Sequence, residues 1–242
     1  MAYDQDAGLL VGSKYRFYLN LKRPGDPNDY YERLARGFSS FEPGDNPEVD
    51  QTAYLDGDGF STSTVMGAQY TITFSGHRYF GDPVQDWIFS RQIGIGRERE
   101  TDLYIVEPNG TVIRGDVTLA GITGGSGGAN EKREIEVEIH FNGRPEVIHV
   151  EPPANLTASN ITATGADLSW DAIDVPDGTT VTYDVYQDGV KIGSDISTTS
   201  YSVTDLESNT EYHFDVVAKV EFATNVVVES IHSEPIAVTT IE

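Results

Sequence analysis

The 242-residue chain contains no cysteine, so disulfide bonds, thiolate metal sites and cysteine nucleophiles are excluded. It also has no apolar run long enough to span a membrane, and residues 1–17 lack the layout of a signal peptide. We therefore expect a protein that is assembled in a cytoplasm and has no membrane partner. Hydrophobic residues make up 38% of the chain and aromatic residues 10%, which favours packed cores over disorder.

Cationic residues are scarce: 16 Lys and Arg stand against 39 Asp and Glu, for a formal net charge of -23. Residues 1–150 hold 14 of these cations and 23 acidic residues, whereas residues 151–242 hold two cations and 16 acidic residues. Binding to a phosphate backbone needs cationic side chains that release counterions, so a nucleic-acid-binding role is excluded. The acidity serves either solubility or the repulsion of DNA.

Two adjacent prolines, Pro152 and Pro153, mark a change in composition. Proline stiffens the backbone and cannot continue a strand ladder, so we expect two domains, residues 1–150 and 151–242. In the second, short segments rich in Val, Ile, Thr and Tyr alternate with turn clusters, which predicts a seven-stranded β-sandwich. The predicted strands are 155–158, 167–170, 180–186, 190–192, 200–203, 211–220 and 236–241.

The second domain resembles a fibronectin type III or immunoglobulin-like module. Leu206, a short polar turn and Tyr212 before an alternating strand resemble the tyrosine corner of that family, and Trp170 and Tyr183 fit its core. Such modules act as binding domains in some proteins and as spacers or decoration in many. A passive surface module is the favoured interpretation, since residues 151–242 contain no RGD tripeptide.

The first domain is predicted to be mainly β, a barrel or sandwich with one helix. Alternating apolar and polar residues predict strands at 14–21, 69–75, 116–120 and 131–141. Asp82 as N-cap and Pro83 in the first turn predict a helix over about 83–92, and a helical turn is expected at 28–36. Residues 39–59 are dense in Pro, Gly, Asp and Asn and predict a long loop.

Several separate motifs in one order make residues 10–150 similar to tail tube proteins of siphophages that infect Gram-positive hosts. They are FEP at 41–43, DQTAYLDGDG at 50–59, FSGHR at 74–78, GD at 81–82, QDWIF at 85–89, VEPNG at 106–110, GDVT at 115–118 and GITGG at 121–125. The resemblance implies a virion protein without catalysis or cofactor. Its copies form hexameric rings that stack into a tube through which DNA passes, with the tape measure protein and other tail proteins as further partners.

The resemblance suggests a function for the acidic side of the segment 131–141. Ile135, Val137 and Ile139 share one side of the predicted strand, and the acidic residues occupy the other. A lumen lined with carboxylates repels passing DNA, although an ordinary solvated strand face would look the same. The expected lumen residues are Glu134, Glu136, Glu138, Thr71, Thr73 and Ser75, and the expected inter-ring loop residues are Asp45, Asn46, Glu48 and Asp50.

Some residues resemble parts of catalytic or metal-binding motifs, but the surrounding sequence lacks what those motifs require. Gly124–Gly128 matches the G-x-S-x-G pattern around Ser126, but an alternating strand follows where a nucleophile elbow needs a helix. The acidic run from Asp56 lacks the Gly and Glu of a calcium loop at the sixth and twelfth positions. The histidines have no metal-ligand spacing. We expect no catalytic residue, no metal site and no cofactor. The alternatives are a surface adhesin that binds through residues 151–242 and an enzyme such as an esterase or glycosidase.

Overall fold

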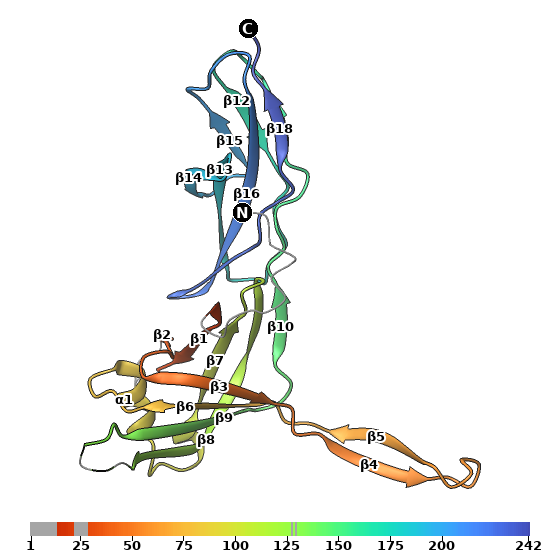
Figure 1. Ribbon diagram of the computed structural model, residues 1–242, viewed down its shortest axis with the longest axis vertical. Coiled ribbons are helices and arrows are strands. Elements are labelled where there is room, and N and C mark those ends of the chain that lie inside the picture. The colour runs from red at the N-terminus through yellow and green to blue at the C-terminus, as the bar shows by residue number, and fades with distance from the viewer. Residues whose placement is uncertain (1–13, 22–28, 127, 129) are drawn as a thin grey trace. The chain divides into compact units, whose positions relative to one another are not determined.

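The computed structural model describes residues 14–21, 29–126, 128 and 130–242, and it is mainly β (Figure 1). Contacts divide the described chain into two compact units. The first unit comprises residues 16–105 and 113–147, and the second comprises the described residues 14–15, 106–112 and 148–242. The first unit corresponds to most of the predicted N-terminal domain. The second adds residues 106–112, a turn between two strands, to the predicted C-terminal domain.

An eight-stranded sheet forms the frame of the first unit. Its order is β2-β1-β7-β8-β9-β6-β3, with β10 paired to β8. The strands are β1 (Arg16–Asn20), β2 (Tyr31–Arg33), β3 (Phe38–Gly44), β6 (Thr71–His77), β7 (Glu100–Val106), β8 (Thr111–Ser126), β9 (Glu134–Phe141) and β10 (Glu146–His149). All four strands predicted in this part of the sequence are present, with β8 longer than expected.

Contacts between aromatic rings show that the sheet rolls over on itself. Strands β1 and β6 are separated by three other strands in the sheet, yet the ring centroids of Phe17 and Phe74 are 4.9 Å apart. Phe17 also meets Phe41 of β3 at 4.8 Å. The two ends of the sheet therefore face each other across a buried core, which confirms the predicted barrel or sandwich.

One short helix, α1 (Pro83–Phe89), closes this core. The side chain of Asp82 accepts a hydrogen bond from the backbone N–H of Gln85 at 3.0 Å, as expected of an N-cap. The side chain of Gln85 is fully buried; it donates to the carbonyls of Arg36 and His77 and accepts from the N–H of Tyr79. The predicted helix to residue 92 was too long, because residues 90–93 form turns. A 3₁₀ helix, η2 (Gly96–Arg99), follows.

Two predictions for this unit were wrong. The segment 39–59 is not a loop: it contains most of β3 and all of β4 (Glu48–Ala53), which pairs with β5 (Ser61–Gly67) in a separate two-stranded sheet. Residues 28–36 do not form a helical turn, because β2 occupies 31–33; residue 28 lies outside the described residues. In both segments pairing with another strand outweighs local turn propensity.

The second unit is a sandwich of a three-stranded sheet, β11-β12-β15, and a five-stranded sheet in which β14, β13, β16 and β17 lie in that order and β18 also pairs with β16. The strands are β11 (Thr157–Ser159), β12 (Ala166–Ser169), β13 (Thr180–Gln187), β14 (Val190–Ile196), β15 (Ser200–Val203), β16 (Glu211–Ala223), β17 (Val226–Glu229) and β18 (Ile236–Thr239). β18 matches the seventh predicted strand, residues 236–241, whereas β17 was not predicted; both strands pair with β16.

The inner faces of the two sheets enclose one core. Trp170, Tyr183 and Phe214 are among its buried members. The tyrosine corner is present as predicted, because the backbone N–H of Glu207 donates to the hydroxyl of Tyr212 at 2.9 Å.

Candidate functional site: an acidic sheet face and a projecting arm

The acidic face of β9 has the two-sided pattern predicted from the sequence. Along Glu134–Phe141 the apolar residues are buried at every second position, whereas Glu134 and Glu136 are exposed and Glu138 is half-buried. Nε2 of His140 lies 2.8 Å from Oε1 of Glu138. The strand therefore presents its carboxylates on the side of the sheet away from the core.

Strand pairing extends this face over four neighbouring strands. On β6, Thr73 and Ser75 are the partners of Glu138 and Glu136. On β3, Glu42 pairs with Thr73. We define the acidic face by the residues that these registers bring to one side: Ser40 and Glu42 of β3, Thr71, Thr73, Ser75 and His77 of β6, Thr118 and Thr123 of β8, and Glu134, Glu136, Glu138 and His140 of β9.

The composition of the acidic face decides its electrostatics. Four of the twelve residues of the face are glutamates, and none of the twelve is Lys or Arg. The face therefore has no Lys or Arg to neutralise its glutamates. Gly121 of β8 leaves room for one of these side chains, because a Cβ there would lie 3.2 Å from the Cβ of Glu138. The face therefore offers hydroxyl groups and carboxylates to a passing molecule, which disfavours phosphate.

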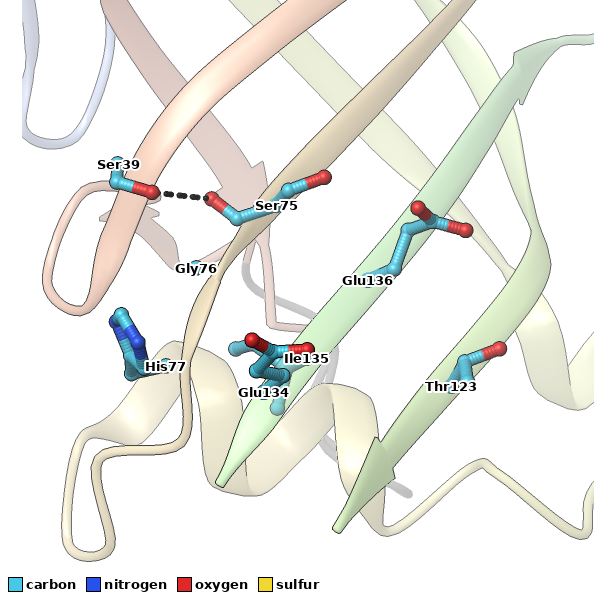
Figure 2. Close-up of a pocket in the computed structure, with 8 residues that line it drawn as sticks. All are labelled: Ser39, Ser75, Gly76, His77, Thr123, Glu134, Ile135 and Glu136. Carbon is cyan, nitrogen blue, oxygen red and sulfur yellow. Dashed lines mark hydrogen bonds between the residues drawn. The ribbon is translucent and has the colours of Figure 1, made fainter. Parts of the chain in front are cut away.

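A depression of about 430 Å³ lies at one end of the acidic face (Figure 2). Glu134, Glu136 and Thr123 come from β9 and β8, and Figure 2 shows them beside His77 and Ser75 of β6. The remaining lining residues are Ser39, Gly76 and Ile135. Among these described lining residues, no side-chain nucleophile is hydrogen-bonded to a base.

Two glycines shape the edge of this depression. A Cβ on Gly76 would lie 2.1 Å from the carbonyl oxygen of Gly37, which no side chain permits. Gly37 itself has a φ of +83°, in the left-handed region that favours glycine. The hydroxyl of Ser39 donates to the carbonyl of Ser75 across the same junction. These contacts hold β3 close to β6 at the end of the sheet.

The predicted lumen residues all lie on the acidic face, but they differ in exposure. Thr73 and Ser75 are half-buried, whereas Thr71 is buried with 7% of its surface exposed. The amide of Asn46 donates to the Thr71 hydroxyl at 2.8 Å and covers it. Sequence analysis missed Glu42 and His77 as members of the face. The register of β3 and β6 would have identified them, but β3 was predicted to be a loop.

A hairpin arm, residues 48–67, is the second candidate feature. Strands β4 and β5 pair only with each other, and Figure 1 draws them beyond the ends of β3 and β6. Large hydrophobic side chains on the arm are exposed, a state that soluble monomers avoid in clusters. They are Val49 (44%), Tyr54 (61%), Leu55 (106%), Phe60 (81%), Val65 (63%) and Met66 (67%).

The predicted inter-ring residues lie at the base and along the first strand of this arm. The carbonyl of Asp45 accepts from the N–H of Gln69 at 3.1 Å, which closes the base. Asn46, with a φ of +38°, reaches across to Thr71. Glu48 and Asp50 belong to β4 and are exposed. The exposed tip, residues 54–60, was not singled out by sequence analysis.

Comparison with known proteins identifies the domain that follows the two prolines. The fibronectin type III domain model matches residues 151–238. These residues are a fibronectin type III domain. A chitinase of Paenibacillus xylanexedens is 43% identical over 75 residues, which are 31% of this chain and 14% of the chitinase, so the chain spans only a small part of that protein's length.

Solved structures similar to the chain include tail and tail tube proteins. The tail of an empty gene transfer agent (GTA) particle, refined with C6 symmetry, has a TM-score of 0.47 and 13% identity over 58% of this chain and 99% of that one. The SPP1 tail tube has a TM-score of 0.45 and 10% identity over 59% and 80%. A Fn3-like protein from Clostridium thermocellum has a TM-score of 0.29 and 23% identity over 38% and 97%.

Two other classes of site have no counterpart in the described residues. Among them, no cluster of three or more His, Asp or Glu side chains has an arrangement that could hold a metal ion. Neither does any helix in the described ranges have the length and apolar character needed to cross a membrane. Ser126 is the last residue of β8, and the next described element is the strand β9.

Proposed function

We propose that the chain is a structural subunit of a bacteriophage tail tube, of the type found in siphophages of Gram-positive hosts. Copies assemble in the host cytoplasm into stacked hexameric rings, and the tube conducts genomic DNA during ejection. The acidic face supports this proposal most directly, because it joins four glutamates over neighbouring strands without a Lys or Arg among them. The ring number rests on the sequence resemblance alone.

Ring formation would complete the sheet of the first unit. Strands β2 and β3 end the sheet, and β3 pairs only with β6. A strand at the end of a sheet presents backbone N–H and C=O groups that can pair with another chain. Pairing of this edge with a neighbouring copy would place the acidic faces of successive copies around one central channel.

Such a channel would let DNA slide without sticking. Phosphates are repelled by carboxylates, and no cation on the acidic face offers an attachment point. The face therefore contributes no chemistry: it acts by excluding binding. The tape measure protein and other tail proteins are the further partners that this role implies.

The arm would join rings along the tube. A contact between different surfaces of identical copies does not close on itself and so generates a filament. The exposed hydrophobic side chains of residues 48–67 fit a segment that becomes covered on assembly.

The fibronectin type III domain has a separate role in this proposal, as a surface module that leaves the assembly of the first unit unchanged. A second candidate function, an adhesin that binds through this domain, is favoured by the family match over residues 151–238. The adhesin hypothesis differs from the tail tube hypothesis in two respects. It requires residues 151–242 for function, and it predicts a monomer.

Negative-stain microscopy of the purified protein tests the proposal. We expect rings or tubes from the full chain and from a variant that ends at Val150. Circular dichroism of the truncated variant serves as the folding control. A protein that stays monomeric at high concentration, with and without residues 151–242, would contradict the tail tube and leave the adhesin.

A further inference from the structure

The loop 93–97, between α1 and β7, exposes two large aliphatic side chains. Ile93 is 95% exposed and Ile95 is 83% exposed, and Arg97 beside them is exposed as well. We call this segment the isoleucine loop. Aliphatic side chains of this size gain free energy when they leave water, so two of them side by side mark a surface that becomes covered.

The isoleucine loop is held firmly from behind by Arg99. Its guanidinium donates to the carbonyls of Gly94 (2.8 Å) and Gln92 (2.5 Å), and also to those of Leu119 and Ala120 on β8. In addition, the carboxylate of Glu98 accepts from the N–H of Ile95. The loop is therefore preorganised, and little conformational entropy is lost when a partner covers it.

The tip of the arm, residues 54–60, has the complementary composition. It exposes Tyr54, Leu55 and Phe60 and carries two acidic residues, Asp56 and Asp58. The sequence contains no Lys or Arg between Arg36 and Arg78, so the tip has no cation of its own. The tip therefore offers apolar side chains and carboxylates, and the isoleucine loop offers apolar side chains and the Arg97 guanidinium, with the neighbouring Glu98 carboxylate engaged by the N–H of Ile95.

We propose that the isoleucine loop of one copy is the docking site for the arm tip of another copy. This inference rests on the proposed function and names the receiving surface for the arm. The apolar side chains of both segments are between 61% and 106% exposed, so they do not cover each other within one chain. The contact joins two different surfaces and therefore propagates from copy to copy.

Disulfide trapping tests the contact directly, because the chain has no cysteine. The double variant Leu55→Cys with Ile95→Cys is assembled and oxidised, and the products are separated on a denaturing gel without reductant. We expect a ladder of covalent oligomers, since each copy then bonds to two neighbours. The matched control pairs Leu55→Cys with Val147→Cys, another exposed aliphatic position, and should give no product beyond a dimer.

Three results would overturn the inference. In the first, the double variant forms tubes but yields no ladder on oxidation. This result would refute the docking site and leave the tail tube proposal standing. The second is an equal ladder from the Val147→Cys control. The third is an unmodified chain that forms no tubes at all, which removes the proposed function and the docking site with it. The first two results separate failure of the docking site from failure of the tube.

A charge exchange gives a second measurement without chemical modification. Arg97→Asp, or Asp56→Arg together with Asp58→Arg, should shorten tubes several-fold, because each places like charges across the contact. Combining both changes in one chain should restore tube length. Arg144→Asp is the control at another exposed arginine and should leave tube length unchanged. Equal shortening by the control, or no restoration in the combined variant, would count against the contact.

Discussion

The two units of this chain treat their hydrophobic residues differently. Fourteen large hydrophobic residues are exposed in the described part of the chain, and eleven of them belong to the first unit. The second unit has only Val190, Ile231 and Ile241 in this class. A domain that functions alone covers its apolar surface, whereas a subunit of an assembly keeps part of it for its neighbours. By this measure the second unit covers its own apolar surface, and the first carries the exposed hydrophobic residues that the proposed assembly would cover.

Charge separates the units in a similar way. Lys191 and Lys219 are the two Lys or Arg residues of the segment 148–242, and both are paired with carboxylates of that segment. Nζ of Lys191 lies 2.5 Å from Oδ2 of the buried Asp184, and Nζ of Lys219 lies 2.6 Å from Oδ1 of Asp195. The first unit instead keeps exposed arginines such as Arg97. The contrast between a closed and an open unit can be tested by breaking each in turn.

Removing the arm should have the largest effect, and it should affect assembly alone. Residues 49–66 can be replaced by an Asn-Gly turn, because Glu48 and Gly67 are already register partners and a two-residue turn connects such a pair. We expect isolated rings and no tubes in microscopy. The unfolding free energy should change by less than about 1 kcal/mol, since the arm adds no side chain to either core. Tubes of normal length from this variant would refute an inter-ring role.

Opening the core of the second unit should give the reverse result. Phe214 is fully buried between the two sheets. Phe214→Ala leaves a cavity and should cost about 3–5 kcal/mol of unfolding free energy, as measured in denaturant. Tubes should still form, because this domain is not part of the proposed ring. The exposed Val190→Ala of the same unit is the control, with stability close to that of the unmodified chain and tubes unchanged. Loss of tubes in Phe214→Ala would show that the two units depend on each other.

The buried carboxylate of Asp184 should produce a smaller, pH-dependent effect. Burial alone would raise its pKa, but hydrogen bonds from Lys191 and the N–H of Asp195, with the charge of Lys219, hold the pKa below its ordinary value. A depressed pKa stabilises the folded state above the ordinary value of 3.8, and this stability is lost as the pH falls through the folded pKa. Asp184→Asn should cost about 1.5–3 kcal/mol at neutral pH.

Below about pH 4 the difference between the two proteins should shrink, because protonation removes the same charge from the unmodified chain. Denaturant titrations at pH 7 and pH 3 measure both points. Asp167→Asn is a useful comparison, because hydrogen bonds from Ser202 and Asn160 lower the pKa of its exposed carboxylate without a cation. A loss for Asp184→Asn that is equal at both pH values would contradict the charge-based account.

The second unit was predictable because its sequence signals are local. Asp188-Gly189 and the other turns delimit short strands, and Leu206 and Tyr212 mark the tyrosine corner. Strand β17 had no comparable signal and was not predicted. The alternation in β9 also fixed the acidic face in advance, since a period of two places Glu134 and Glu136 on one side whatever their partners.

The arm and strand β3 were missed for a physical reason. Residues 39–59 are rich in Pro, Gly and Asp, which disfavour strands locally, yet Pro43 pairs with Ile72 at the end of the sheet, where a missing N–H costs least. Glu42 consequently went unnoticed as a member of the acidic face. Exposed tip residues such as Leu55 also looked like ordinary loop residues, because a sequence does not reveal which hydrophobic side chains stay outside the core.

Substitutions on the acidic face should have the smallest effect on folding, but they should slow DNA ejection. Glu134→Lys, Glu136→Lys and Glu138→Lys together leave the buried side of β9 untouched, so tubes should form and stability should change little. A lumen with these lysines attracts phosphate, and phage particles carrying them should eject DNA several-fold more slowly, with the delay greatest at low salt. Glu207→Lys, Glu211→Lys and Glu234→Lys make the same change in net charge on exposed positions of the second unit. Only the β9 glutamates face the proposed channel. Equal ejection rates for the two triple variants would therefore show that the acidic face does not line the lumen, even if the protein forms a tube.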